Sequence, residues 1–229
     1  MFAVRGESRN VPCMKAIDMR LLLGRLAVVG PIAFTVAWVA AGLAQDEYSL
    51  RREDISALAA LDAQKPWFMI AGFLLLGVGI VALAIGLGGA LEGRRAVTGA
   101  ILVAIAGIGI IVAGLARNDC SSELDACVER IDAGNVSWHH STHDLVSGVV
   151  FLSLVAATLV LARVFRGHES WRDLRIYSIV TGLLGLTLLI MFVTEVASSW
   201  NGIVQRIFVS VLFLWIALLG ARLIRLARA

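Results

Sequence analysis

Residues 138–144 read WHHSTHD, and the apolar stretch LVSGVVFLSLVAATLVLARVF follows at once from Leu145 to Phe165. This apolar run is long enough to cross a hydrocarbon core of about 30 Å, which takes roughly 20 helical residues. The heptapeptide before it holds three of the chain's four histidines. The segment His143–Phe165 therefore predicts a transmembrane helix that enters the membrane beside a histidine cluster.

Five more stretches share this length and apolar character. Together with the first they give six predicted spans: Gly24–Ala44, Trp67–Leu91, Val97–Ala116, His143–Phe165, Ile176–Ala197 and Ile203–Leu223. Unpaired backbone polar groups are not tolerated in lipid, so the spans must be helices. Only 16% of the 229 residues are charged, against about a quarter in soluble domains. We predict an all-α membrane protein, a six-transmembrane-helix bundle; five spans with one re-entrant segment is the alternative.

The Lys and Arg residues divide unevenly between the two ends of the predicted helices. Fourteen of the 20 share the end that holds both termini; they are Arg5, Arg9, Lys15, Arg20, Arg25, Arg94, Arg95, Arg163, Arg166, Arg172, Arg175, Arg222, Arg225 and Arg228. The opposite end holds Arg51, Arg52, Lys65, Arg117, Arg130 and Arg206. Cytoplasmic loops carry the excess of basic residues, so both N- and C-termini are predicted to be cytoplasmic. Trp67, Trp138 and Trp200 fall at the outer ends of helices, where an interfacial aromatic belt lies.

The chain divides into a cytoplasmic tail, residues 1–20, and the transmembrane domain, residues 21–229. The tail lacks the small-residue cleavage site of a signal peptide, so the first apolar run is predicted to remain as a helix. Met1, Met14 and Met19 are alternative starts. The net charge of +3 comes mostly from basic residues that flank apolar segments, so no nucleic-acid partner is expected. The expected partners are membrane lipid and another membrane protein, in the inner (plasma) membrane of a prokaryote.

Two outer connections have distinctive patterns. The first, Gln45–Pro66, carries apolar residues at helical spacing, which fits a short helix on the membrane surface or a lid over the bundle. The connection Asn118–Thr142 holds Cys120 and Cys127. On the oxidising side of the membrane these are predicted to form a disulfide worth roughly 2–3 kcal/mol; metal ligation with the histidines is the alternative.

Ionisable residues cluster near the outer ends of the predicted helices, and charges at the membrane usually mark a functional interior. At 100° per residue, the polar residues of the fourth span share one face of about two turns. We expect an outward-facing polar pocket formed by His139, His140, His143, Asp144, Ser147, Glu195, Arg206, Arg117 and Asp119. Glu195 and Arg206 are expected to pair across the fifth and sixth helices. The alternative is that these side chains reach the interface or clasp helices without any ligand.

Two histidines have the spacing of metal ligands. His139 and His143 are four residues apart, which puts two imidazoles within reach of one cation such as zinc. The leading interpretation is that the protein has no metal or other cofactor. In that interpretation Ser141 or Thr142 caps the helix and the histidines are hydrogen-bonded.

Several short motifs carry a resemblance to a known family. They are the stretch from Tyr48-Ser49 through Ile55-Ser56-Ala57-Leu58, then Asn118-Asp119, His139 through His143-Asp144-Leu145, and Gly202 through Gln205-Arg206. In this order the chain, from about Gly24 to Leu226, resembles the six-helix prokaryotic membrane proteins called domain of unknown function 998. The resemblance implies six transmembrane helices and no particular reaction. The cysteines after Asp119 depart from its pattern.

A second similarity is to membrane ceramidase-like hydrolases, which hold zinc with Ser, Asp and several His residues. His139 and His143 match their His-x-x-x-His element, and Ser56 matches the serine. The histidines that those enzymes carry on other helices are missing here. The leading hypothesis is a non-catalytic module that binds lipid or a partner through its outer pocket. The alternative is a zinc-dependent hydrolase of a lipid amide or ester, with Asp144 or Glu195 as base.

Overall fold

The computed structural model describes residues 11–121, 125–194, 196 and 198–229, and every regular element in this part of the chain is helical. Six helices are long and apolar enough to cross a membrane. They are α1 (Val11–Leu43), α2 (Pro66–Ala90), α3 (Arg94–Leu115), α5 (Trp138–Phe165), α6 (Leu174–Val193) and α7 (Asn201–Arg228). The predicted bundle of six spans is confirmed.

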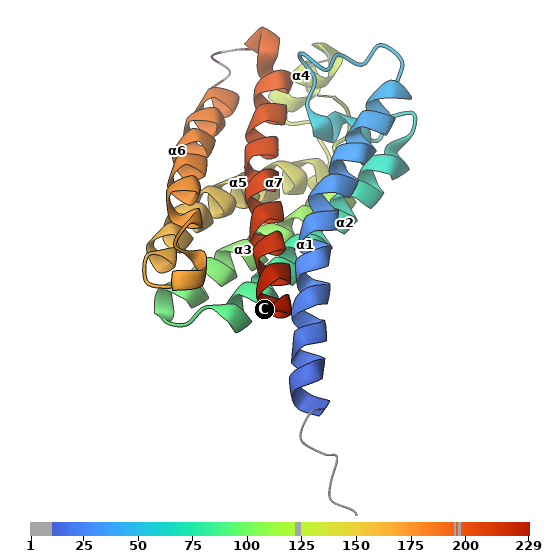
Figure 1. Ribbon diagram of the computed structural model, residues 1–229. Coiled ribbons are helices and arrows are strands. Elements are labelled where there is room, and N and C mark those ends of the chain that lie inside the picture. Colours follow the sequence, from blue (N-terminus) through green and yellow to red (C-terminus); the bar gives the residue numbers. More distant parts are fainter. Residues whose placement is uncertain (1–10, 122–124, 195, 197) are drawn as a thin grey trace, which may run out of the picture.

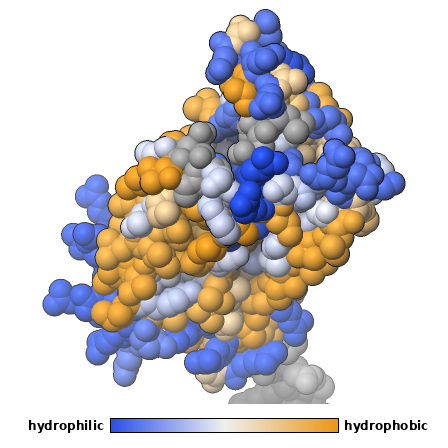
Figure 2. Space-filling model, turned by 90° about the horizontal axis from the view of Figure 1, so that it is seen from above, coloured by the Kyte–Doolittle hydropathy of each residue, from blue (hydrophilic) through white to orange (hydrophobic). Residues whose placement is uncertain are grey.

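The shorter elements lie in the connections. They are η1 (Ile55–Ala59), α4 (Asp125–Asp132), η2 (Glu169–Trp171) and η3 (Ser198–Trp200). Figure 1 shows α4 at one end of the bundle, which we call the α4 end, and the C-terminus toward the other, the terminal end. Two connections at the α4 end matter below: loop A, residues 44–65, and loop B, residues 116–137. Seen from the α4 end, hydrophobic residues cover much of the flanks and strongly hydrophilic residues gather near the centre (Figure 2).

The six long helices form a closed ring. In ring order they run α1, α2, α3, α5, α6 and α7, and each packs chiefly against its two ring neighbours, with α7 returning to α1. Only α2 and α7 also make substantial contact across the ring, among the described residues. Such a ring leaves a central space that side chains must fill or line.

Glycine allows α2 and α3 to approach closely. A Cβ atom added to Gly77 would lie 2.7 Å from the carbonyl oxygen of Gly107, and one added to Gly107 would lie 2.8 Å from the backbone nitrogen of Val81. Small residues at facing positions are a common way for membrane helices to pack without a hydrophobic driving force. This seam is therefore closed by backbone-to-backbone contact.

Loop A folds over the ring as a lid. Its η1 segment contacts α1, α2 and α7, and Ile55, Ala57, Leu58 and Ala59 are buried. Of the two predicted arrangements for the first connection, the lid over the bundle is the one that the structure shows. Trp67, Trp138 and Trp200 stay exposed around the same end, as the aromatic-belt prediction requires.

Candidate functional site

The site begins at the first turn of α5. Ser137 is its N-cap, and the Ser137 hydroxyl accepts a hydrogen bond from the backbone N–H of His140. The helix starts at Trp138, so the expectation that Ser141 or Thr142 caps it is wrong. Because the helix already includes the whole heptapeptide, its polar residues project from consecutive turns of one rigid element.

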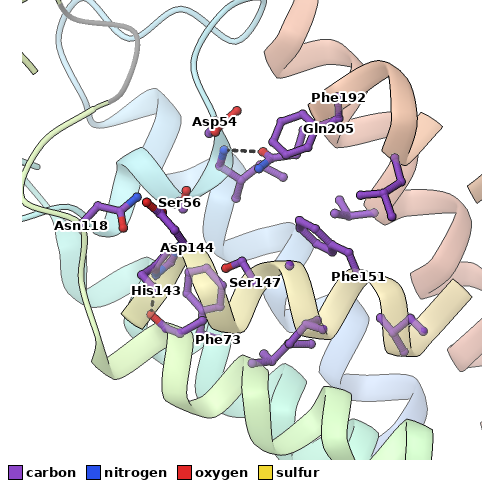
Figure 3. A pocket seen from close by; sticks show the side chains of 18 of the residues that line it. Asp54, Ser56, Phe73, Asn118, His143, Asp144, Ser147, Phe151, Phe192 and Gln205 are labelled. Atoms are coloured by element: carbon purple, nitrogen blue, oxygen red, sulfur yellow. Dashed lines mark hydrogen bonds between the residues drawn. The ribbon is translucent and has the colours of Figure 1, made fainter. Parts of the chain in front are cut away.

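A cavity of about 300 Å³ lies inside the ring, toward the α4 end. Its apolar part is lined by aromatic and aliphatic side chains of α1, α2, α3, α5, α6 and α7, among them Phe34, Phe73, Leu76, Ile110, Phe151, Leu154, Leu189, Phe192, Val209, Leu212 and Phe213. Its polar lining comes from loop A, loop B, α5 and α7: Asp54, Ser56, Asn118, His140, His143, Asp144, Ser147 and Gln205. Figure 3 shows Ser56, Asn118, His143 and Asp144 gathered on one side and Phe151 and Phe192 on the other. The cavity is amphipathic.

Two aromatic contacts hold the apolar floor of the cavity in place. The ring of Phe34 packs edge-on against Phe73, with centroids 5.1 Å apart, and against Phe213 at 5.3 Å. Edge-to-face pairs of this kind contribute about 0.5–1.5 kcal/mol beyond the burial of their area. The floor thus joins α1, α2 and α7 directly.

The two buried histidines of α5 are oriented by loop B and by the end of α3. His143 places Nδ1 2.9 Å from the carbonyl oxygens of both Ala113 and Ala116. Carbonyl oxygens only accept, so Nδ1 of His143 carries the proton. His140 uses Nδ1 to accept the backbone N–H of Asp119 at 3.1 Å, which requires an unprotonated Nδ1 and leaves Nε2–H facing Asp144 at 3.4 Å.

The cavity is open at its rim between α5 and α6. Its exposed lining residues are Asp144 and Gly148 of α5, Val193 at the end of α6, and Ile131 of α4 above them. Leu154 and Leu189, deeper along α5 and α6, are buried. A Cβ atom added to Gly148 would have no atom within 4 Å. The opening therefore lies at the side of the bundle, near the α4 end.

Arg206 anchors loop A. Its Nη1 donates to the carbonyl oxygens of Leu50 and Glu53, both at 2.9 Å, and to that of Gly202 at 2.8 Å, while Nη2 donates to the hydroxyl of Tyr48. The guanidinium also lies over the ring of Trp38, 5.3 Å from its centroid. A buried Arg is stable where several acceptors face its planar fork. Glu195, the expected partner of Arg206, lies outside the described residues.

Neighbouring residues extend this anchor. Gln205 accepts the backbone N–H of Ile55 at 2.7 Å, and the Tyr48 hydroxyl donates to the carbonyl of Asp54 at 2.8 Å. Burial raises the pKa of the Tyr48 hydroxyl despite the nearby Arg206, so the proton needed for this bond stays in place. A Cβ atom on Gly202 would lie 2.5 Å from the carbonyl oxygen of Glu53, so loop A can lie this close only against a glycine.

Arg117 joins loop A to loop B. Its Nε donates to the carbonyl of Ala59 at 2.7 Å and its Nη2 to that of Ala60 at 2.6 Å. Its own carbonyl accepts from Nδ1 of His139 at 2.6 Å. Arg117 and His139 therefore hold backbone segments together and do not line the cavity.

Asp119 organises loop B. Its carboxylate accepts the backbone N–H of Ser137 at 2.7 Å and the Ser137 hydroxyl at 2.6 Å, and Arg130 lies 3.4 Å away. Burial opposes ionisation of Asp119, but the two bonds from Ser137 and the nearby His139 outweigh it, so the pKa of this carboxyl lies below its ordinary value. Further along loop B, Cys120 and Cys127 form a disulfide with Cα atoms 5.9 Å apart. The predicted disulfide is confirmed.

The structure thus divides the residues expected around the pocket. His140, His143, Asp144 and Ser147 line the cavity. Arg117, Asp119, His139 and Arg206 lie beside it and hold the loops. Sequence reasoning missed Asp54, Ser56, Asn118 and Gln205 as polar lining residues. The last three belong to the short motifs that carry the family resemblance.

The described residues include no group of three or more His, Cys, Asp or Glu side chains that could hold a metal ion. His139 and His143 both direct Nδ1 to backbone carbonyl oxygens, an arrangement that is also common for histidines that bind a metal through Nε2. For the zinc-hydrolase alternative, the described residues thus supply these histidines but no group of three ligands.

The ring of six apolar helices closed by two interlocked loops defines a multi-pass membrane protein with a cavity near one end. The chain belongs to the family described as "Protein of unknown function (DUF998)", whose sequence model matches residues 28–222. The matched segment contains every lining residue of the cavity and all the anchoring residues described above. No curated protein and no solved structure matches the chain.

Proposed function

We propose that the protein is a non-catalytic lipid-binding module that takes the end of a membrane amphiphile into its cavity. One observation carries this proposal: the cavity has an apolar floor and a buried polar side, and its rim opens between α5 and α6. An amphiphile in the membrane offers the same two surfaces. Its chain can replace contacts with lipid by contacts with Phe34, Phe73 and Phe213, while its head reaches the polar residues of α5.

The size of the cavity supports a small ligand or part of a larger one. Its volume of about 300 Å³ lies at the lower end of the range of small-molecule sites, about 300–1,000 Å³. Burying apolar surface contributes roughly 25 cal/mol per Å², so a chain that fills the floor gains affinity without any charged contact. The remainder of a long amphiphile would stay in the membrane, outside the opening.

The proposal includes the orientation of the protein in the membrane. We place the α4 end outside the cell and the terminal end in the cytoplasm of a prokaryote, because the basic residues favour the terminal end and the exposed tryptophans surround the α4 end. The disulfide in loop B supports this sidedness, since disulfides persist in oxidising compartments. The ligand would then come from the outer leaflet of the plasma membrane.

A substitution that blocks the opening of the cavity tests this proposal. Gly148→Trp places an indole in open space at the rim. Gly88→Trp makes the same change at a position of α2 where a Cβ atom also meets nothing within 4 Å, and Gly88 does not line the cavity. Both proteins are purified in mild detergent, and the lipid that remains bound is measured by native mass spectrometry. We expect the retained lipid to fall at least about fivefold in Gly148→Trp and to stay unchanged in Gly88→Trp. A fivefold fall corresponds to a loss of about 1 kcal/mol of binding free energy.

Equal retention in the two variants and the unaltered protein would contradict the proposal. A co-purifying protein lost from Gly148→Trp, with lipid unchanged, would also contradict it and would favour a partner helix at this opening. Stoichiometric zinc that disappears in His143→Ala would favour the hydrolase instead.

A further inference from the structure

The charges around the cavity have one sign. Its lining includes two carboxylates, Asp54 and Asp144, and no Lys or Arg among the described residues. Three arginines neighbour lining residues in sequence, and each has other partners. Arg117 donates to the carbonyls of Ala59 and Ala60, and Arg206 to those of Leu50 and Glu53. Arg130 pairs with Asp119. Among the described residues, no Lys or Arg side chain therefore forms part of the cavity wall.

The histidines do not supply the missing positive charge. Nδ1 of His140 accepts the backbone N–H of Asp119, and a protonated imidazole has no acceptor nitrogen, so His140 is neutral in this arrangement. Its remaining N–H faces Asp144, 3.4 Å away. His143 donates its Nδ1 proton to the carbonyl oxygens of Ala113 and Ala116, so this proton is not offered to a ligand.

Asn118 adds an acceptor without a partner. The side chain is 9% exposed, it lines the cavity, and its Oδ1 makes no hydrogen bond. Figure 3 shows the amide beside Ser56, above His143. A buried polar atom without a partner is energetically unfavourable, and a ligand that donates a hydrogen bond to it would recover that loss.

We propose that the ligand of this cavity has a head that donates hydrogen bonds and carries no phosphate, that is, a hydroxyl or amine head. This inference rests on the proposed function, because it assumes that an amphiphile enters the cavity. A hydroxyl or ammonium group donates to Asn118 and Asp144 and matches the negative wall. A phosphate head would bring a like charge close to Asp144 with no cation to compensate, and like charges in a partly desolvated site repel strongly.

The experiment measures protection of a cysteine at the opening. Cys13 is replaced by Ser, and Gly148→Cys is introduced; Gly88→Cys in the same background is the matched control. Each protein is placed in phosphatidylcholine nanodiscs and labelled with a thiol reagent in the presence of decanoylglycerol, decylamine or decyl phosphate. These probes share a ten-carbon chain and differ in the head. We expect decanoylglycerol and decylamine to slow labelling at position 148 at concentrations about tenfold lower than decyl phosphate, with position 88 unaffected by all three.

The outcomes separate the two proposals. Equal protection by all three probes, or stronger protection by decyl phosphate, overturns the inference about the head and leaves lipid binding in place. No protection at position 148 beyond that at position 88 overturns both.

A second variant tests the source of the selectivity. In Asp144→Asn the preference for decylamine over decyl phosphate should shrink by about threefold or more, because one of the two carboxylates has gone. Asp62→Asn removes an exposed carboxylate of loop A that does not line the cavity, and the preference should stay as it was. An unchanged preference in both variants would contradict the electrostatic explanation.

Discussion

Single residues at the α4 end act mainly as anchors for backbone. Arg206 alone donates to three carbonyl oxygens and to Tyr48. Basic residues at the ends of membrane helices often extend to the membrane interface and bind nothing else. The sequence does not distinguish such a residue from one that, like Arg206, donates to backbone carbonyls of a loop. The partners of Arg206 in loop A come from a part of the chain about 150 residues earlier, and helical periodicity contains no information about such contacts.

Removal of Arg206 should destabilise the protein strongly. Arg206→Ala leaves several carbonyl oxygens without donors, and each such loss costs about 1–3 kcal/mol. We expect the midpoint of thermal denaturation in detergent to fall by roughly 5–10 °C, and Arg206→Lys to restore little because an ammonium cannot reproduce the planar fork. Arg52→Ala, at an exposed position of loop A, is the control. A shift no larger than that control would contradict the anchoring role.

The Asp119 carboxylate should make stability depend on pH. Its folded-state pKa is lowered, so its contribution is present above the unfolded pKa of about 4 and is lost as the pH falls through the folded value. Asp119→Asn should therefore lower the denaturation midpoint at pH 7, where bonds to a charged group contribute about 1.5–3 kcal/mol. The difference between the two proteins should shrink below about pH 4. A difference that is constant with pH would contradict this assignment.

At the scale of whole elements, the sequence predicted much more of the structure than it did for the contacts of single residues. Length and apolar character were enough to locate all six long helices. Only helices and closed β-barrels satisfy the backbone in lipid, and barrel strands are much shorter than these apolar runs. The ends were less well placed. α5 starts at Trp138, five residues before the predicted span, since Ser137 provides the cap, and α1 begins at Val11, well before the predicted Gly24. Polar residues outside the apolar run can continue a helix, so hydropathy alone does not mark its end.

The disulfide should stabilise loop B and little else. Reduction, or replacement of Cys120 and Cys127 by Ser, opens a short ring, and chain-entropy reasoning gives a loss of roughly 2–3 kcal/mol. We expect loop B to become sensitive to added protease near α4 while the helices remain resistant. Cys13→Ser serves as the control for loss of a thiol. Protease resistance that survives reduction would show that Asp119 and Ser137 hold the loop unaided.

The α2–α3 seam should tolerate no added side chain. Gly107→Val would push a branched side chain against the backbone of Val81 and force the two helices apart, which we expect to cost at least 2 kcal/mol by analogy with overpacked cores. Gly88→Val, at a glycine of α2 with open space around it, should change the denaturation midpoint little. Equal effects of the two variants would contradict close packing at this seam.

At the scale of the whole molecule, the ring and its cavity follow from contacts between distant segments. The sequence indicated a polar layer near one membrane face, and four of the five α5 residues predicted in it, all except His139, line the cavity. It could not show that Arg117 and Arg206 donate to loop A, so that the described part of the cavity wall contains no Lys or Arg. The charge of the site is therefore a property of the assembled ring.

The orientation of the ring is open to direct measurement. With 14 of the 20 Lys and Arg residues at the terminal end, a reporter fused after Arg228 should be active only in the cytoplasm, and one inserted at Gly134 of loop B only outside it. Gly134 is exposed and a Cβ atom there meets nothing within 4 Å, so the insertion should not disturb packing. The opposite pattern would place the cavity in the inner leaflet.

The anchoring of loop A has a consequence for biosynthesis. Loop A leaves the ribosome directly after α1, yet Gln205 and Arg206 bind it from positions 150 and 156 residues away from Ile55 and Leu50. This early connection must therefore wait until the last helix is in place before it is held. A nascent chain that ends before α7 would carry an unfastened lid, which gives quality-control proteases a simple signal that synthesis is incomplete.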